Sequence, residues 1–372
     1  MPATWAERAA AAETAITTRH IRALWGLPGR KLGLTRWPAT LGQRLFLPQW
    51  HYWWQAHLVD CAIDAYERAG GRNRAARIHC LIRGLRWHNL GKWINRYYDD
   101  IAWLGLALER ADRIAGIRYP GGLSAVSDQL HHGWTDHAGG GIWWRRDDNF
   151  KNIPANGPAA ILHARLGQLD RARAMTQWMT NHLIDPATGL ALDGLHVNLE
   201  TGETWFEAGD RRIFTYCQGV YIGACIELWR HDGDEMWTER AGGVIAATAR
   251  HLTLPGGSLR GQGGGDGGLF TGILARYLAQ AALHLPPGPD RDTARQLVMD
   301  SAAAAWETHR QVAGGPLFSP SWTTPAVIPT QGKSFSRRGR TAKRPEIIER
   351  DLSVQLSGWM TLESAALLER SG

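Results

Sequence analysis

Apolar residues recur along most of this chain at the spacing of an amphipathic α-helix. They lie three or four residues apart, in segments of about ten to twenty residues that are separated by Gly, Pro, Asn and Asp. The pattern predicts an all-α protein of about twelve helices. The predicted helices cover residues 5–25, 51–69, 73–91, 99–115, 123–132, 157–167, 169–184, 213–230, 234–252, 269–284, 290–312 and 351–369.

Short polar links between these segments indicate helical hairpins. Gly70-Gly71-Arg72-Asn73 and His231-Asp232-Gly233-Asp234 are typical of tight connections between antiparallel helices. A series of such hairpins can close into a toroid of inner and outer helices, and six hairpins would complete the ring. A simple bundle or an open solenoid would use similar helices, but the chain has no repeat of fixed period.

Three longer irregular stretches interrupt the helical pattern, at residues 133–156, 185–212 and 313–350. Long loops in a compact domain are often functional. Within the middle stretch, the segment from Thr188 to Val197 alternates between polar and apolar residues, which predicts a small β-hairpin. We expect little other β-structure.

Composition is that of a globular protein with a sizeable core. The chain has 372 residues, of which 44% are apolar and 21% are charged, and we expect one domain over residues 1–372. Four cysteines without Cys-x-x-Cys spacing suit a reducing compartment. The start of the chain lacks the pattern of a secretory signal, and no apolar run has membrane length. These features predict a cytoplasmic protein, with export by an unrecognised route as the alternative.

The net charge of +7 does not indicate nucleic-acid binding, because Arg and Lys are spread over the whole chain without a recognised nucleic-acid module. The densest basic run lies within residues 333–344, beside Gly and Pro. It is typical of a solvated loop. The alternative is that this run attracts an anionic polymer or a lipid headgroup.

Nineteen tryptophans are the most unusual feature of the composition. Several are adjacent, including Trp53-Trp54 and Trp143-Trp144. Flat aromatic rings stack well on the C–H faces of pyranose sugars, so the clusters favour a carbohydrate site. For any single tryptophan, core packing is the simpler explanation.

Two adjacent acids, Asp99 and Asp100, stand where an apolar helical pattern begins. Acids at a helix start can simply cap the helix and compensate its dipole. Here, however, Tyr97, Tyr98 and Trp103 surround two charges that would normally face open water. Adjacent carboxylates in a semi-enclosed cleft repel each other, which separates their pKa values into an acid and a nucleophile. Glycoside hydrolysis requires this division of roles.

Three further stretches could contribute to a sugar-binding cleft. The segment from Gly139 to Pro158 contains Trp143, Trp144, Asn152 and Asn156, and Asn156 would otherwise cap the helix that follows. The helix around Phe214 to Tyr221 would point Tyr216 and Gln218 inward, unless they serve ordinary packing. The glycine-rich segment from Gly261 lacks the Gly-Lys-Ser/Thr ending of a phosphate loop, so it is better explained as a cleft wall that presents Asp266 and Phe270.

No motif indicates a metal ion, a cofactor or a cysteine nucleophile. His131, His132 and His137 lack a recognised metal-ligand spacing. Cys217 has no assignable His or Asn partner. The chain also has no Gly-x-Ser-x-Gly elbow and no dinucleotide fingerprint.

Taken together and in order, these stretches resemble glycoside hydrolase family 76, the endo-α-1,6-mannanases and related transglycosylases. No single piece is decisive, but the ordered set is specific and spans roughly residues 50 to 370. The matching pieces are Tyr98-Asp99-Asp100-Ile-Ala-Trp103, Gly140-Gly-Ile-Trp143, Lys151-Asn152-Ile-Pro-Ala-Asn156, Thr215-Tyr216-Cys217-Gln218-Gly219, Gly265-Asp266-Gly-Gly-Leu-Phe270-Thr-Gly272-Ile and Asp351-Leu-Ser-Val-Gln355.

The resemblance implies an (α/α)6 barrel that cuts α-1,6-mannan with retention of configuration. Asp99 would be the nucleophile and Asp100 the general acid/base, with no cofactor and no metal. The substrate would be mannan or a mannosylated lipoglycan, including an anionic lipoglycan. The expected substrate-binding residues are Tyr98, Trp143, Trp144, Asn152, Asn156, Tyr216, Gln218, Asp266 and Phe270.

This sequence departs from the family pattern at Ile101, Cys217 and Thr271, where the family usually has Asn, Asn and Lys. The loops near residues 26–48 and 313–350 also look additional. Two alternatives stay open: a transglycosylase that uses the same carboxylates, and a mannan-binding protein without turnover. The pair Asp99 and Asp100 argues against the second.

Overall fold

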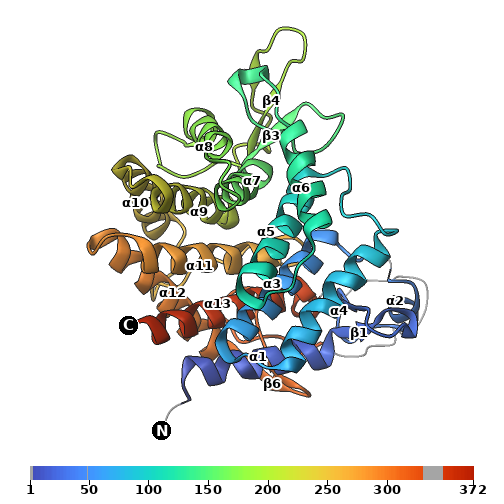
Figure 1. Cartoon of the computed structure of the whole chain (residues 1–372). Coiled ribbons are helices and arrows are strands. Elements are labelled where there is room, and N and C mark those ends of the chain that lie inside the picture. Colours follow the sequence, from blue (N-terminus) through green and yellow to red (C-terminus); the bar gives the residue numbers. More distant parts are fainter. Residues whose placement is uncertain (1–2, 48, 330–346) are drawn as a thin grey trace, which may run out of the picture.

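The computed structural model describes residues 3–47, 49–329 and 347–372, and helices dominate it (Figure 1). The basic segment 333–344 lies outside the described residues. The helices are α1 (Trp5–Arg19), α2 (Leu41–Phe46), α3 (Tyr52–Ala69), α4 (Arg72–His88), α5 (Tyr98–Ala115), α6 (Pro120–His132), α7 (Ile153–Arg165), α8 (Leu169–Leu183), α9 (Thr215–Asp232), α10 (Glu235–His251), α11 (Gly267–His284), α12 (Pro289–Thr308) and α13 (Leu352–Ser371).

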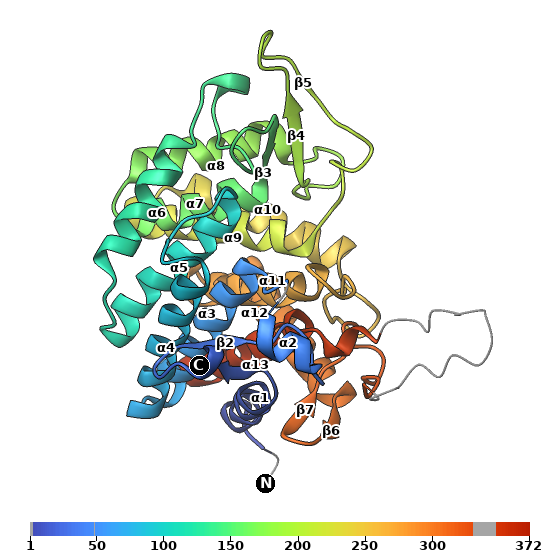
Figure 2. The same cartoon turned by 90° about the vertical axis from the view of Figure 1, so that its right-hand side faces the viewer.

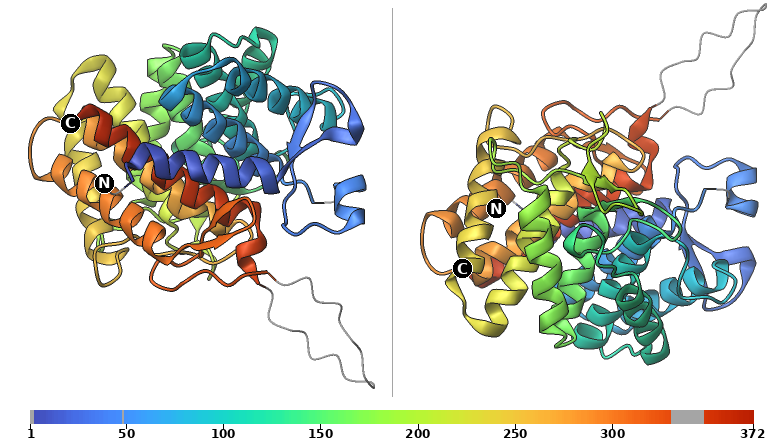
Figure 3. Two further views of the ribbon diagram at one scale, coloured as in Figure 1. Left: turned by 90° about the horizontal axis from the view of Figure 1, so that it is seen from below. Right: turned by 90° about the horizontal axis from the view of Figure 1, so that it is seen from above.

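Twelve of these helices form a closed double ring. The inner helices α3, α5, α7, α9, α11 and α13 each pack against the next, and α13 packs back against α3. Each inner helix carries an outer partner, which is α4, α6, α8, α10, α12 and α1 in the same order. The last pair joins opposite ends of the chain, and α1 lies across α13 in the view from below (Figure 3, left). The predicted (α/α)6 barrel is therefore confirmed.

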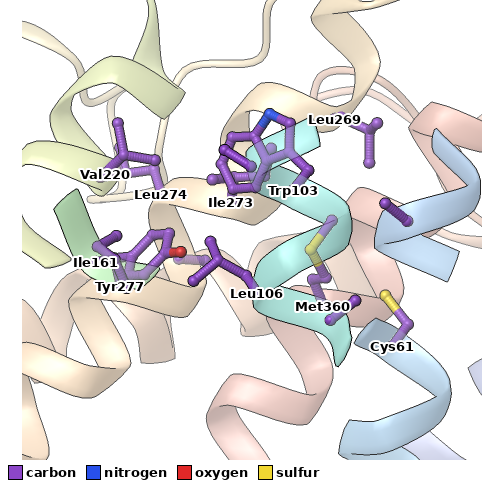
Figure 4. Packing of buried hydrophobic residues seen from close by; sticks show 14 of the residues in the cluster. Cys61, Trp103, Leu106, Ile161, Val220, Leu269, Ile273, Leu274, Tyr277 and Met360 are labelled. Carbon is purple, nitrogen blue, oxygen red and sulfur yellow. The ribbon is translucent and has the colours of Figure 1, made fainter. Parts of the chain in front are cut away.

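The inner helices are buried nearly all round, so they need small residues where they touch. A Cβ atom at Gly219 of α9 would lie 2.9 Å from the Cα atom of Leu274 in α11, and one at Gly272 of α11 would lie 2.6 Å from Cα of Ser357 in α13. Between these contacts, aliphatic and aromatic side chains from different inner helices meet in one core (Figure 4). Larger residues at the two glycines would force neighbouring helices apart.

The twelve predicted helices are all present, but some ends differ. The first ends at Arg19 rather than at residue 25. Helix α7 begins at Ile153, four residues earlier than predicted, and Asn152 caps it by accepting a hydrogen bond from the Ala155 N–H at 3.2 Å. Asn156 is therefore not the cap, and Pro154 takes the early helical position that proline tolerates. Helix α2 was not predicted, since only six residues form it.

The β-structure exceeds the prediction, although every strand is short. Residues 188–197 do not form a hairpin by themselves: their end forms a strand that pairs with one strand far upstream and another downstream. The sheets are β1 (Ile21–Ala23) with β2 (Lys31–Gly33), then β3 (Phe150–Asn152) with β4 (Gly194–Val197) and β5 (Thr204–Trp205), and β6 (Arg310–Val312) with β7 (Gly315–Leu317). Among the described residues, no helix combines the length and apolar character needed to cross a membrane.

A ring of ion pairs closes one end of the barrel. Arg110 of α5 contacts Asp64 of α3 at 2.8 Å, and Arg276 of α11 also pairs with Asp64. These pairs line a cavity of about 280 Å³. Every inner helix contributes to the network, whose further members are Asp60, Arg68, Glu109, Arg165, Glu227 and Glu363. The charges are nearly buried, so each depends on its partners for the interactions that water would otherwise supply.

We expect Arg110→Met to lower the free energy of unfolding by about 3–5 kcal/mol, because it leaves Asp60, Asp64 and Glu67 with one fewer counter-charge in a nearly buried site. Chemical denaturation measures the change. The control is Arg118→Met, which removes the pair with Asp112 at the surface, where 78% of the Arg118 side chain is exposed. That pair should contribute about 1 kcal/mol or less. Equal losses in the two variants would show that the buried ring does not carry the stability assigned to it.

Candidate active site

A pocket of about 460 Å³ lies at the end of the barrel where the inner helices begin. Five inner helices supply a lining residue from their first turn or their N-cap: Trp53, Asp99, Asn152, Tyr216 and Asp266. Arg110 lies eleven residues after Asp99 on the same helix, about 16 Å away at 1.5 Å per residue. The pocket and the ion-pair ring therefore occupy opposite ends of the barrel.

Asp99 lines the pocket and accepts two hydrogen bonds. The indole Nε1 of Trp144 donates to Oδ2 at 3.0 Å, and the backbone N–H of Asp100 donates to Oδ1 at 2.8 Å. Burial raises the pKa of Asp99 above its usual range, while these two donors pull the pKa back down. The start of α5 adds a positive dipole end that favours the ionised form.

Asp100 follows on the same helical turn, where burial raises its pKa and hydrogen bonds from Asn95 and from the backbone of Trp53 lower it. Its Oδ2 accepts a hydrogen bond from Asn95 Nδ2 at 2.6 Å. Burial, and then the negative charge of Asp99, raise the pKa of Asp100 well above its usual range. The two carboxyls share one site, so one proton between them is the favoured state, and the environment favours that proton on Asp100. The pair thus separates an ionised carboxylate from a carboxylic acid.

Aromatic rings form one side of the pocket. Tyr216 and Phe270 stack with ring centroids 3.9 Å apart and planes 7° apart, and Trp53 lies 6.2 Å from Phe270. Asp266 accepts hydrogen bonds from the indole N–H groups of Trp53 at 3.1 Å and Trp54 at 2.9 Å, while 59% of its side chain is exposed. A wall of flat rings with a carboxylate at its rim suits the apolar faces and the hydroxyls of a sugar.

The pocket lining also contains polar residues that no sequence motif indicated. Asp193 lies in the pocket, where burial and the charge of Asp210 raise its pKa to about 7. His196 Nε2 lies 3.5 Å from the Asp210 carboxylate. The remaining polar members are Arg145, Asp148 and Arg212. Two sequence features could have indicated these residues. All of them lie in two of the irregular stretches, and Asp193 lies within the alternating pattern of residues 188–197.

Seven of the predicted residues come together at the pocket. Asp100 lies beside the lining residue Asp99, and the lining also contains Trp144, Asn152, Tyr216, Asp266 and Phe270.

The other four predicted residues lie outside the pocket lining and hold neighbouring structure. Asn156 is buried and bonds to both the N–H and the carbonyl of Ile142, at 2.8 and 2.9 Å. Gln218 does the same for Ala191, with both distances 2.8 Å. Tyr98 is buried and accepts a hydrogen bond from Gln129 at 3.3 Å, and the Trp143 ring stacks against the Lys151 ammonium at 4.4 Å.

Lys151 fixes the loop that carries Trp144. Its buried ammonium donates to the carbonyl oxygens of Thr135, His137 and Gly140 at 3.1, 2.7 and 2.5 Å. Burial lowers its pKa to about 7. One cation therefore replaces water for three loop carbonyls, and the loop delivers the Trp144 indole to Asp99.

Within the described part of the chain, no three His, Cys, Asp or Glu side chains gather in a way that could hold a metal ion. What the arrangement offers is acid, base and nucleophile chemistry on a bound sugar, performed by carboxyl groups.

Comparison with known proteins agrees with this geometry. The family model for glycosyl hydrolase family 76 matches residues 8–350. The chain is 30% identical to the GH76A α-1,6-mannanase of Salegentibacter sp. HEL1_6, with a TM-score of 0.81 over 98% of this chain and 99% of that one. A structure from Listeria innocua, the Lin0763 protein, is 28% identical with a TM-score of 0.80, over 100% and 99% of the two chains. No curated protein matches.

An inactive variant of the Salegentibacter mannanase, in which two consecutive aspartates are changed to asparagine, has been solved with α-1,6-mannotriose. That variant is 29% identical to this chain, with a TM-score of 0.82 over 98% of this chain and 99% of the other. At lower identity, 17%, a mannosidase from Bacteroides thetaiotaomicron shares the fold, with a TM-score of 0.75 over 98% and 99%. Since the family model covers most of the ring and the residues that build its pocket, the chain belongs to glycosyl hydrolase family 76.

Proposed function

We propose that this protein is a retaining endo-α-1,6-mannanase that acts through Asp99 and Asp100. The observation that carries the proposal is the carboxyl pair at the start of α5, where two donors favour the ionised form of Asp99 against burial, and burial and the charge of Asp99 favour protonation of Asp100. The likeness to an α-1,6-mannanase at 30% identity over nearly the whole chain supports the substrate class.

Two pairs of consecutive aspartates occur in this chain, and only one has a suitable environment. Asp147 is 92% exposed, and Asp148 forms a short-range ion pair with Arg145. Asp99 and Asp100, by contrast, lie at the pocket in low-dielectric surroundings that shift both pKa values upward. Since the inactive Salegentibacter variant lacks two consecutive aspartates, we assign the corresponding role to the buried pair.

The proposed reaction has two steps. First, the Asp99 carboxylate attacks the anomeric carbon while the bond to the leaving oxygen breaks, and Asp100 donates its proton to that oxygen. Second, Asp100 accepts a proton from water, the water oxygen bonds to the anomeric carbon, and the bond to Asp99 breaks. Two inversions at the same carbon return the original α-configuration. The Trp144 N–H steadies Asp99 as a leaving carboxylate in the second step.

The pocket walls fit a chain of mannose residues. The stacked pair Tyr216 and Phe270 and the nearby Trp53 present apolar area to sugar faces, while Asp193, Asp266 and Arg212 present polar groups to hydroxyls. A polymer lying along the pocket, with sugars on both sides of Asp99, would be cut within its length, which is the endo action that we propose. Product lengths from linear α-1,6-mannooligosaccharides test this, and products longer than the substrate would indicate transfer to a sugar hydroxyl instead of water.

Azide rescue should distinguish the nucleophile from the general acid/base. The substrate is an α-mannobioside that carries an activated aryl leaving group, and Asp99→Gly should hydrolyse it about a thousandfold or more slowly than the native chain. Azide should restore turnover of this variant and give a β-mannosyl azide, because azide replaces the nucleophile in a single inversion. Asp100→Gly should instead give an α-mannosyl azide, since Asp99 still acts first. Proton NMR distinguishes the anomers.

The matched control for azide is Asp147→Gly, which changes the exposed pair and should keep native rates without azide. If Asp99→Gly gave the α-mannosyl azide and Asp100→Gly the β-mannosyl azide, the two roles would have to be exchanged. A native chain that binds mannooligosaccharides without cutting them would reject the enzyme assignment.

The pH profile should be bell-shaped, with its acidic limb above the usual carboxyl range, because burial raises the pKa of Asp99 and activity is lost once Asp99 is protonated. Trp144→Phe removes a donor that stabilises the ionised form, so the pKa rises further and the acidic limb of kcat/KM should move up by about one pH unit. Trp143→Phe changes the adjacent indole, which does not contact Asp99, and should leave the limb in place. An unchanged limb in Trp144→Phe would contradict the role given to this hydrogen bond.

A further inference from the structure

Two segments of this chain contain many cations and no acid. Residues 14–59 contain six Arg or Lys residues and residues 68–98 contain eight, while none of the 35 Asp and Glu residues of the chain lies in either segment. The chain as a whole has 42 basic and 35 acidic residues, so the absence of Asp and Glu from two long segments requires an explanation. Some of these cations pair with acids elsewhere in the fold, as Arg68 does with Glu363.

The two segments meet on one face of the molecule. Helix α4 packs against β2 so closely that a Cβ atom at Gly84 would overlap the carbonyl oxygen of Lys31. Trp25 bridges the segments further: its indole donates to the carbonyl of Leu45 at 2.9 Å, and its ring stacks on His88 at 5.6 Å. Figure 2 shows α2, β2 and α4 together on the side turned toward the viewer, and Figure 3 shows α2 standing out from the barrel.

Large apolar side chains project from this face into solvent. Leu41 and Phe46 of α2 are 72% and 73% exposed, and Leu90, just after α4, is 87% exposed. Trp25, Leu45 and Trp87 are the other members, so this face holds six of the eleven exposed large apolar residues among those the structure describes. Such a concentration is unusual for a surface that faces only water.

Exposed cations surround these apolar residues. They are Arg22, Lys31, Arg44, Arg83, Arg86 and Lys92, and none of them forms an ion pair with a carboxylate in the described ranges 3–47, 49–329 and 347–372. Burial and the nearby charge of Arg44 lower the pKa of Arg22, which places two like charges side by side. The face therefore combines a projecting apolar tip with uncompensated positive charge.

The backbone of this face also holds apolar residues in an unfavourable conformation. Trp25, Leu47 and Leu90 have φ values of 48°, 44° and 55°, in the left-handed region that glycine and asparagine occupy more easily. Trp25 and Leu90 use that conformation to present large side chains to solvent. Residues in this backbone region are found more often at functional sites, so their presence here favours a function for the face.

We propose that the face formed by α2, the β1–β2 hairpin and the end of α4 docks on a membrane that contains anionic lipids. Projecting Trp, Phe and Leu side chains enter the boundary between headgroups and acyl chains, and the surrounding Arg and Lys bind lipid phosphates. A protein partner fits less well, because a protein interface uses charges of both signs to fix its orientation, and this face carries one sign only.

Docking at this face would bring the pocket close to the lipid surface. Trp53 of the pocket comes seven positions after Phe46 of the docking face, which limits their distance to about 25 Å. A glycan anchored in the same membrane would then lie within reach of Asp99 and Asp100. This consequence rests on the proposed function, whereas the docking itself does not.

Vesicle sedimentation of the full chain tests the inference. We expect binding to phosphatidylcholine vesicles that contain phosphatidylglycerol, no binding to phosphatidylcholine alone, and loss of binding at high salt. The variant L41S/L45S/F46S should reduce the partition coefficient about tenfold or more by removing the apolar tip. The variant R22Q/K31Q/R44Q should reduce it by about fivefold for each cation removed.

The controls are L199S and R250Q, which remove an exposed apolar residue and an exposed cation far from this face and should bind vesicles as the native chain does. Thermal unfolding confirms that each variant folds. Vesicle binding is measured without mannan, so its outcome does not depend on the proposed mannanase activity. No binding to anionic vesicles overturns the inference, and so does equal binding by L41S/L45S/F46S, which would locate the contact elsewhere. A native dimer that L41S/L45S/F46S dissociates, without vesicle binding, would show that this face instead pairs two copies of the chain.

Discussion

Closure of the inner ring is the constraint on which the rest of this structure depends. Six helices must lie parallel to one axis with almost no exposed surface, so their contacts require small residues such as Gly219 and Gly272. Because the six helices are parallel, their N-terminal turns all lie at one end of the barrel and their C-terminal halves lie at the other. Charge follows this division. The catalytic pair lies where the helix dipoles are positive, and the opposite end closes with paired Arg and acidic side chains.

The chemistry of the pocket is a product of that arrangement. Asp99 and Asp100 are adjacent in sequence and differ mainly in what donates to them, Trp144 in one case and Asn95 in the other. The loop bearing Trp144 is held by Lys151, whose ammonium donates to three of its carbonyls, and by Asn156, which bonds to the backbone of Ile142. A carboxyl pair made by local sequence thus acquires two distinct pKa values through contacts made by distant segments.

Sequence predicted what is local and periodic, and little of what is assembled over distance. Helix periodicity located all twelve ring helices, and the two acids at a helix start stood out among aromatic neighbours. Motif resemblance was less precise about roles: Asn156 and Gln218 belong to matching motifs, yet their amides hold the backbone of Ile142 and Ala191. Asp193 and Asp210 were missed because only the pairing of β3 with β4 brings their segment over the pocket.

The pairing of α1 with α13 has a consequence for synthesis of the chain. Helix α1 is made more than 300 residues before its main partner α13. At roughly 5–20 residues per second, that interval is tens of seconds. During it, the apolar side of α1 and the open edge of α3 lack their final cover, and only the last helix can complete the circle. Closure of this barrel therefore has to wait until α13 has been made, and the incomplete ring is expected to need protection from aggregation until then.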